Sequence, residues 1–257
     1  MIKLSVVIIT LNEEKNIGRC LDAIKDIADD ILVVDSYSTD KTEAICKEKG
    51  ARFIQHPFEG YTEQKNVALD EALYDHVLSL DADEIPSEEL LESLKKVKEN
   101  WDADGYSMNR LTNYCGAWIH HCSWYPDRKL RLVDRKTARW EGHRIHESLN
   151  PQKDNYNEVV LKGDLLHYSF YTVEEHHRQV EKFTDIGALA DFEKGKRSNH
   201  VKMILSPVVK FIRDYFMKLG ILDGIPGLRV CWISAGATRK KYVKLWKHQQ
   251  DAKKNGK

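Results

Sequence analysis

The first hundred residues alternate between apolar runs typical of strands and segments with helical spacing. Four runs rich in Val, Ile, Leu and Phe are typical of buried strands: LSVVIIT, DILVVDS, ARFIQH and HVLSLDAD, at 4–10, 30–36, 51–56 and 76–83. The segments between them space apolar side chains three and four positions apart, at 13–27, 38–50 and 62–74. Strands that alternate with helices predict an α/β fold with a mostly parallel, doubly wound sheet.

Residues 201–257 differ from the rest of the chain in pattern and in charge. The chain has 40 Lys and Arg against 40 Asp and Glu, but this tail has 13 basic and three acidic residues. It therefore carries +10, and the first 200 residues carry −10. Its apolar stripe, interleaved with Lys and Arg, is typical of a helix on an anionic membrane surface or of a helix packed on another domain. We expect a basic helical appendage at 201–257.

Composition excludes several classes of protein. A net charge of zero gives no indication of a nucleic acid partner. The five cysteines include no C-x-x-C pair, which favours reduced thiols in a cytoplasmic compartment. The apolar run at the N-terminus is too short for a signal peptide, and no apolar run reaches the ~18 residues of a spanning helix.

Acidic residues follow three of the predicted strands, in TLNEE, DSYSTD and DADE. In a parallel sheet, ligands bind at the carboxyl ends of the strands. Neither G-x-G-x-x-G nor G-x-x-x-x-G-K occurs, so a bound phosphate needs another counter-charge. Asp81 and Asp83, two positions apart in an extended segment, point the same way and can hold Mg²⁺ or Mn²⁺. The alternative is that Asp83 and Glu84 only favour the dipole of the helix that follows.

Other polar residues are candidates for nucleotide contacts. The Asp35 carboxylate can accept the imide N–H of uracil, a donor that cytosine lacks, or it can be a turn residue. Lys65 in EQKN can reach a diphosphate or lie solvated on a helix. Arg128 and Arg131 in PDRKLRL can grip phosphate or form ordinary surface charge.

Four of these segments, SVVIITLNEEKNI, ILVVDSYSTDKT, EQKNVALDEA and LSLDADE, resemble the inverting family 2 glycosyltransferases. That family has the nucleotide-diphosphosugar transferase (GT-A type) fold. YPDRKLRLVDR, WEGHRIHESL and LLHYSFYTVEEH further resemble the branch of bacterial lipopolysaccharide core β-1,4-glucosyltransferases. The resemblance implies a UDP-sugar donor, with glucose as the expected sugar, a divalent metal, and a glycolipid or oligosaccharide acceptor.

The resemblance also implies roles for single residues. It places Thr10, Glu13 and Asp35 around the uracil, Asp81 near the ribose and Asp83 on the metal. The usual family motif has two adjacent acids after the second strand, whereas here a serine follows Asp35. The expected contact with the uracil base therefore depends on Asp35 alone. We expect a catalytic domain at 1–200, with a nucleotide-binding half (1–100) and an acceptor half (101–200).

Inverting transfer needs a group that takes the proton of the acceptor hydroxyl. HRIHE offers His143, His146 and Glu147. We expect Glu147 to be this general base, with Asp127 as second choice; alternatively, Glu147 orients His146 or an arginine. His167 is either a further metal ligand, as in some glycosyltransferases of this fold, or a core histidine.

Two other functions fit parts of the chain. One is a non-catalytic module that binds nucleotide sugars or carbohydrates. The other is a sugar-1-phosphate nucleotidyltransferase, but ITLNEEKN has acids where that class has a Gly-rich basic loop. If the acceptor is a glycolipid, the tail is expected to hold the protein at the inner face of the inner membrane, with shallow burial of Phe211, Ile212, Tyr215 and Phe216.

Overall fold

The computed structural model describes residues 1–142 and 147–254. It divides into two compact units. Unit 1 consists of Met1–Leu111 and Asp127–Tyr168, and unit 2 of Thr112–Pro126 with the chain from Ser169 onward. These units differ from the expected boundary at residue 200, because helix α5 (Val173–Glu193) packs along α7 (Gly224–Lys254) and so joins the helical unit.

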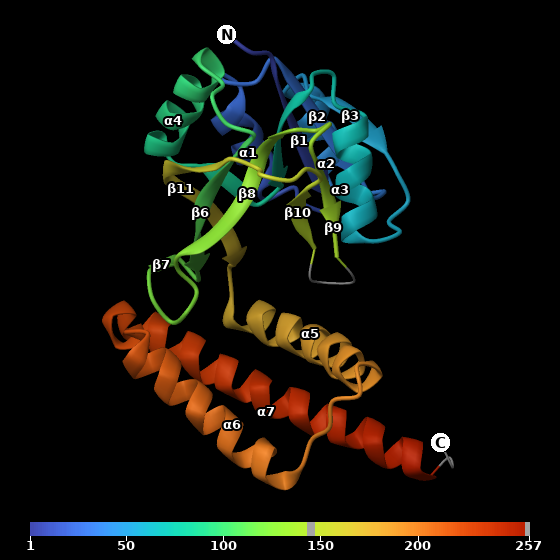
Figure 1. The fold of residues 1–257 in the computed structure, drawn as a ribbon, viewed down its shortest axis with the longest axis vertical. Coiled ribbons are helices and arrows are strands. Elements are labelled where there is room, and N and C mark those ends of the chain that lie inside the picture. Colours follow the sequence, from blue (N-terminus) through green and yellow to red (C-terminus); the bar gives the residue numbers. More distant parts are fainter. Residues whose placement is uncertain (143–146, 255–257) are drawn as a thin grey trace. The chain divides into compact units, whose positions relative to one another are not determined.

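Four parallel strands form one half of the sheet in unit 1 (Figure 1). They run in the order β3-β2-β1-β4. Their bounds are β1 Leu4–Thr10, β2 Asp30–Asp35, β3 Arg52–Gln55 and β4 His76–Asp81. The connecting helices are α1 (Ile17–Ile24), α2 (Thr42–Glu48) and α3 (Tyr61–Asp70). This half confirms the predicted alternation of strands and helices.

The other half of the sheet is antiparallel, so the sheet is mixed rather than mostly parallel. Beyond β4 the order continues β8-β6-β11-β5. The bounds are β5 Glu84–Pro86, β6 Gly105–Tyr114, β8 Asp127–Asp134 and β11 Glu158–Phe170. Helix α4 (Glu88–Glu99) lies between β5 and β6 in the chain, and β9 (Ala138–Glu141) pairs with β10 (Ser148–Pro151) as a separate two-stranded sheet. No crossover helix separates β6, β8 and β11, and strands with short connections pair antiparallel.

Strand β8 contains a bulge. Opposite β6, Leu132 pairs with Tyr106 and Leu130 with Ser107, so Arg131 has no partner in this ladder. A bulge re-aims the side chain of its extra residue and bends the strand.

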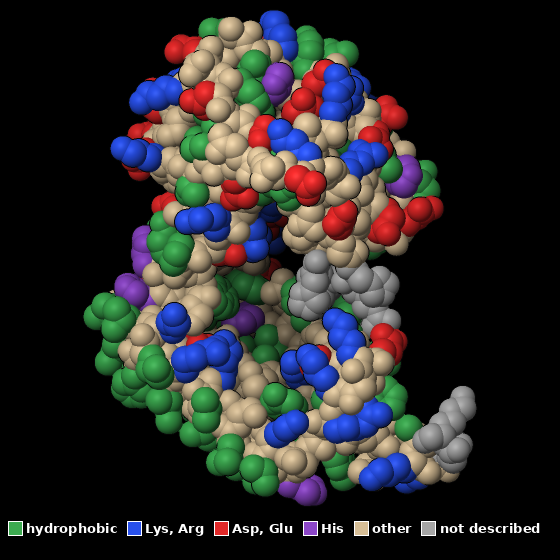
Figure 2. Space-filling model, in the orientation of Figure 1, with side chains coloured by type: hydrophobic (Ala, Val, Ile, Leu, Met, Phe, Trp, Pro, Cys, Tyr) green, Lys and Arg blue, Asp and Glu red, His purple; other side chains and the backbone are tan. Residues whose placement is uncertain are grey.

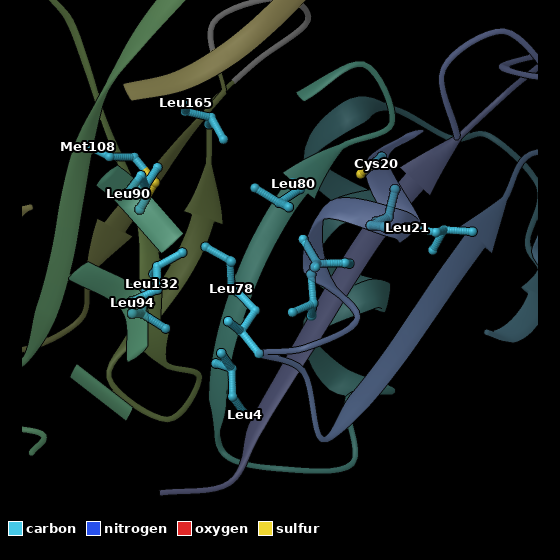
Figure 3. Close-up of a cluster of buried hydrophobic side chains, with 14 of the residues drawn as sticks. Leu4, Cys20, Leu21, Leu78, Leu80, Leu90, Leu94, Met108, Leu132 and Leu165 are labelled. Carbon is cyan, nitrogen blue, oxygen red and sulfur yellow. The ribbon is translucent and has the colours of Figure 1, made fainter. Parts of the chain in front are cut away.

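The main core of unit 1 lies between β1, β4, α1 and α4 (Figure 3). Helix α1 buries Ile17, Cys20, Leu21 and Ile24, with Cys20 and Leu21 three and four positions after Ile17. These side chains meet Leu78 and Leu80, which alternate along β4 and are at most 1% exposed. Because each fully buried aliphatic side chain stabilises the fold by about 1.5–3 kcal/mol, this layer holds β1 and β4 against the helices.

Unit 2 is mostly helical. Short strand β7 (Ala117–Ile119) pairs with the end of β6. Helices α5, α6 (His200–Ile212) and α7 follow, with a π-helical turn, η1 (Arg213–Met217), and a 3₁₀ turn, η2 (Gly220–Asp223), before α7. Along the described residues, no helix combines the length and apolar character needed to cross a bilayer. All five cysteines are free thiols, as expected.

Candidate active site

Asp81, the last residue of β4, lies between two cations. Its Oδ1 is 3.0 Å from Nζ of Lys65, and its Oδ2 is 3.1 Å from Nη2 of Arg131. Burial alone would raise the pKa of Asp81, but the charges of Lys65 and Arg131 outweigh it and lower the pKa. The carboxylate is therefore ionised at neutral pH.

Lys65 connects distant parts of unit 1. It is 3% exposed, on the face of α3 that packs against the sheet, and its Nζ is also 3.4 Å from Oε1 of Glu147. The ammonium lies 4.4 Å from the centre of the Trp140 ring, a cation–π distance. Asn66 accepts a hydrogen bond from the backbone N–H of Trp140 and donates one to its carbonyl. Helix α3 thus holds both β9 and Glu147 beside the end of β4.

A second carboxylate, that of Glu84, also binds Arg131. Glu84 is fully buried, and its Oε1 accepts hydrogen bonds from Arg131 (2.8 Å) and Arg110 (3.3 Å). Its other oxygen accepts the backbone N–H of Asp81 at 3.1 Å. Arg110 in turn binds Asp127 at 2.8 Å. Carboxylates and guanidiniums alternate through this network, so every buried charge has an opposite neighbour.

Asp83 and His167 form a separate pair next to this network. Oδ2 of Asp83 is 3.1 Å from Nε2 of His167, which pairs with Glu84 in the β11–β5 ladder. Burial lowers the pKa of His167, but the charge of Asp83 and its hydrogen bond prevail and raise the pKa. Nδ1 of His167 is buried and has no hydrogen-bond partner among the described residues. One carboxylate and one imidazole therefore converge here.

This pair fits a sparse divalent-cation site. Mg²⁺ binds through one or two protein ligands and fills its remaining positions with water and phosphate oxygens. In the ranges 1–142 and 147–254, no three His, Cys, Asp or Glu side chains are grouped so as to hold a metal ion. Any metal here would take most of its ligands from water and from the substrate.

The first two strands end beside each other, with Thr10 paired to Asp35. Asp35 is fully buried and accepts hydrogen bonds from the backbone N–H of Ser38 (2.7 Å) and from its hydroxyl. Asp35 therefore stabilises the turn that follows β2, and its contact with uracil stays a prediction. The pKa of Glu13 is raised, mainly by burial and further by the charges of Asp83 and other acids. A hydrogen bond from Asn16 lowers this pKa but does not outweigh them.

The model of glycosyl transferase family 2 matches residues 5–158. The chain belongs to this family. It has the expected GT-A type fold, with the acidic turn after β4.

Relatives span most of this family 2 chain. It is 31% identical over 220 residues to the lipopolysaccharide core biosynthesis glycosyltransferase LpsC of Rhizobium meliloti, covering 83% of this chain and 80% of the relative. It is 29% identical over 254 residues to an uncharacterized glycosyltransferase of Rickettsia typhi, covering 95% and 87%. A solved structure of Mycobacterium tuberculosis glucosyl-3-phosphoglycerate synthase is 26% identical with a TM-score of 0.37, and the match covers 44% of each chain, less than half of that protein.

The structure brings five of the eleven expected site residues of this family 2 protein into one network. Lys65, Asp81, Arg131 and Glu147 form one network, and Asp127 joins it through Arg110. Arg128 is exposed on β8, and its phosphate contact stays a prediction. His143 and His146 lie outside the described residues.

The sequence reasoning missed three participants: Glu84 as an anchor, Arg110 and the ring of Trp140. From the sequence, Glu84 was expected only to favour the dipole of the helix that follows. The alternation of β6 could have indicated that Arg110 lies on the sheet beside β8, but the pairing of these strands was not predicted.

Proposed function

We propose that this protein transfers a sugar, glucose as first candidate, from a UDP-sugar to a saccharide of a cell-envelope glycolipid, with inversion and with the help of a divalent cation. The observation that carries the proposal is the family 2 match over 5–158, which contains every candidate site residue except His167. The relative named for lipopolysaccharide core biosynthesis supports the choice of acceptor. In this proposal, the reaction takes place at the inner face of the inner membrane.

The donor binds, in this proposal, at the carboxyl ends of β1, β2 and β4. Thr10, Glu13 and Asp35 contact the uracil, and Asp81 the ribose. Lys65 and Arg131 supply positive charge for the diphosphate, with Arg128 as a further candidate. Lys65 and Arg131 are already held by Asp81, so their side chains need little ordering when the donor arrives.

Asp83 and His167 are the residues that would hold Mg²⁺ or Mn²⁺. A bound cation would act as a Lewis acid and stabilise the charge of the departing diphosphate. The short distance between Asp83 and His167, together with the unpartnered Nδ1 of His167, supports this choice.

Glu147 is the better candidate for the base that takes the proton of the acceptor hydroxyl. Only Lys65 contacts Glu147, among the contacts of the described residues, and at the long distance of 3.4 Å. Asp127, the other candidate, has both oxygens in contact with cations, Arg110 at 2.8 Å and Lys129 at 2.9 Å. An oxygen engaged with a cation is less free to accept a proton, so Glu147 is assigned the role and Asp127 remains second.

A panel of UDP-sugars tests the proposal. Purified protein is incubated with each donor and with lipopolysaccharide core acceptors, and released UDP is measured with Mn²⁺, with Mg²⁺ and with a chelator. Calorimetry compares UDP with CDP. Turnover that requires acceptor and metal, with tighter binding of UDP, is expected. Binding of UDP-sugar without any turnover would instead indicate a non-catalytic nucleotide-sugar module, and equal affinity for CDP would refute the uracil contacts.

A further inference from the structure

A dense apolar surface covers α6 and the start of α7 in unit 2. Fourteen exposed large apolar side chains lie between residues 201 and 232, whereas nine are spread over the rest of the described chain. They are Val201, Ile204, Leu205, Val208, Val209, Ile212, Phe216, Met217, Leu219, Ile221, Leu222, Ile225, Leu228 and Trp232. Figure 2 shows hydrophobic side chains gathered in this region. An exposed patch of this density marks an interaction site.

Helix α6 is apolar on two sides, and its outward side forms part of the apolar surface. Val201, Ile204, Leu205, Val208, Val209 and Ile212 recur every three or four residues and so share one face of α6. The other side of α6 buries Met203 and packs Phe211 against the cluster that contains Val230. Packing within unit 2 is therefore satisfied, and the outward stripe contributes nothing to that core.

Positive charge surrounds the apolar surface, and its two acids are withdrawn from solvent. Residues 201–232 contain five Lys and Arg but only Asp214 and Asp223 as acids. The side chains of these acids are 1% and 4% exposed. Asp214 binds Lys210, Arg213 and Ser123, and Asp223 accepts hydrogen bonds from His121 and the backbone of His120. The exposed charges in this stretch are therefore all basic.

An apolar groove opens between α6 and α7 within this surface. Its volume is about 430 Å³, and its lining includes Pro207, Val208, Phe211 and Trp232, with Arg239 as its only charged lining residue. An apolar channel with a guanidinium beside it matches the chemistry of an acyl chain next to a phosphate headgroup.

We propose that the apolar surface is a docking site for an anionic lipid bilayer. Its aliphatic side chains enter the boundary between headgroups and acyl chains, while Lys202, Lys218 and Arg229 remain among the headgroup phosphates. This refines the sequence-based expectation: Ile212 and Phe216 face outward, whereas Phe211 and Tyr215 pack against the core cluster.

A second copy of the chain fits this surface less well. A twofold interface would set the same surface against itself. The exposed basic residues of one copy would then face those of the other, with no exposed acid between 201 and 232 to compensate. Like charges held together oppose such an association, and an anionic bilayer removes this repulsion.

Vesicle binding by the full-length protein tests the proposal. Co-sedimentation is measured with vesicles of pure phosphatidylcholine and with an equimolar mixture of phosphatidylcholine and phosphatidylglycerol, at low and high salt. Binding to the anionic vesicles that weakens with salt is expected, because screening reduces the electrostatic part. Trp232 is 70% exposed, so the fluorescence emission of the protein should move to shorter wavelength on binding, and Trp232→Phe should remove most of this shift.

Two pairs of substitutions separate the apolar and electrostatic parts. Ile204→Glu with Val209→Glu, at side chains 65% and 63% exposed, should weaken binding about tenfold or more. Leu73→Glu, at a leucine 59% exposed in unit 1, is the matched control and should bind as the parent does. Lys218→Ala with Arg229→Ala should weaken binding about fivefold for each charge removed. The exposed pair Lys47→Ala and Lys95→Ala in unit 1 is their control.

Each outcome decides the question. Equal binding to neutral vesicles, or equal losses with test and control variants, overturns the proposal. So does a protein that ignores vesicles but forms dimers that Ile204→Glu disrupts, because the surface would then be a self-association interface. Circular dichroism confirms that each variant is folded. The assay contains no nucleotide or acceptor, so its result is independent of the proposed transferase activity.

Discussion

Lys65→Met tests the charge network that holds the site together. The substitution keeps much of the length and apolar stem of the side chain while removing the ammonium that contacts Asp81 and Glu147. Asp81 would keep Arg131 as a partner, but Glu147 would lose the only cation that contacts it among the described residues. The pKa of Asp81 should rise, because Lys65 is the largest of the charges that lower it.

The expected loss of stability follows from the exposure of the three side chains. Removing one partner of a fully buried ion pair costs about 3–5 kcal/mol, whereas an exposed pair contributes about 0–1 kcal/mol. The Lys65 side chain is 4% exposed, but those of Asp81 and Glu147 are 25% and 19% exposed, so water reaches the carboxylates. We therefore expect the free energy of unfolding to fall by about 2–3 kcal/mol, between these limits.

Urea unfolding, followed by circular dichroism, measures this loss in the transition that reports on unit 1. Lys47→Met, at a lysine 64% exposed in a surface pair with Glu43, is the control and should change stability by less than about 0.5 kcal/mol. Combining Lys65→Met with Asp81→Asn should cost less than the two single losses together, by about 1–2 kcal/mol. A loss with Lys65→Met no larger than the control would refute the reasoning that Lys65 is a buried bridge.

Three further results are expected. Glu147→Gln should reduce sugar transfer by about 10²–10⁴-fold while UDP binding stays normal, and Glu141→Gln on β9 should reduce neither; normal turnover in Glu147→Gln would move the base elsewhere. Asp83→Asn should remove the strengthening of UDP binding by Mn²⁺ in calorimetry, and an unchanged metal effect would contradict the assignment. The pKa of His176 is lowered from 6.5 to about 4, mainly by burial and then by the charge of a neighbouring histidine. The neutral His176 therefore contributes fully to stability above about pH 6.5, and this contribution is lost as the pH falls toward 4. About 2 kcal/mol should be lost by about pH 5, and His176→Gln should flatten this part of the urea-unfolding profile.

Local patterns predicted the parallel half of unit 1. The apolar runs of β1 to β4 and the helices between them are visible in the sequence because each buries a periodic face against its neighbours. The turn after β4 could be identified for the same reason, since acids that follow a buried strand in a parallel sheet lie at its ligand-binding end.

Contacts between distant segments could not be predicted in this way. Glu84 looks like an acid at a helix start, yet its partners Arg110 and Arg131 lie 26 and 47 positions away. Their meeting depends on the order β4-β8-β6, which no local spacing encodes. In α6 the apolar residues occupy two sides of the helix, and periodicity alone does not show which side faces the core, so Phe211 was expected to face outward.

The bulge in β8 bears on how this family changes in length. Pairing with β6 is in step on both sides of Arg131, with Leu132 opposite Tyr106 and Leu130 opposite Ser107. A chain without the bulge residue keeps both ladders, and every remaining side chain stays on its own face of the sheet. Loss of a residue elsewhere in the strand shifts one ladder and turns buried side chains toward the opposite face. The strand therefore accommodates one extra residue at Arg131 without a change of register, and this extra residue is the one whose guanidinium contacts Asp81.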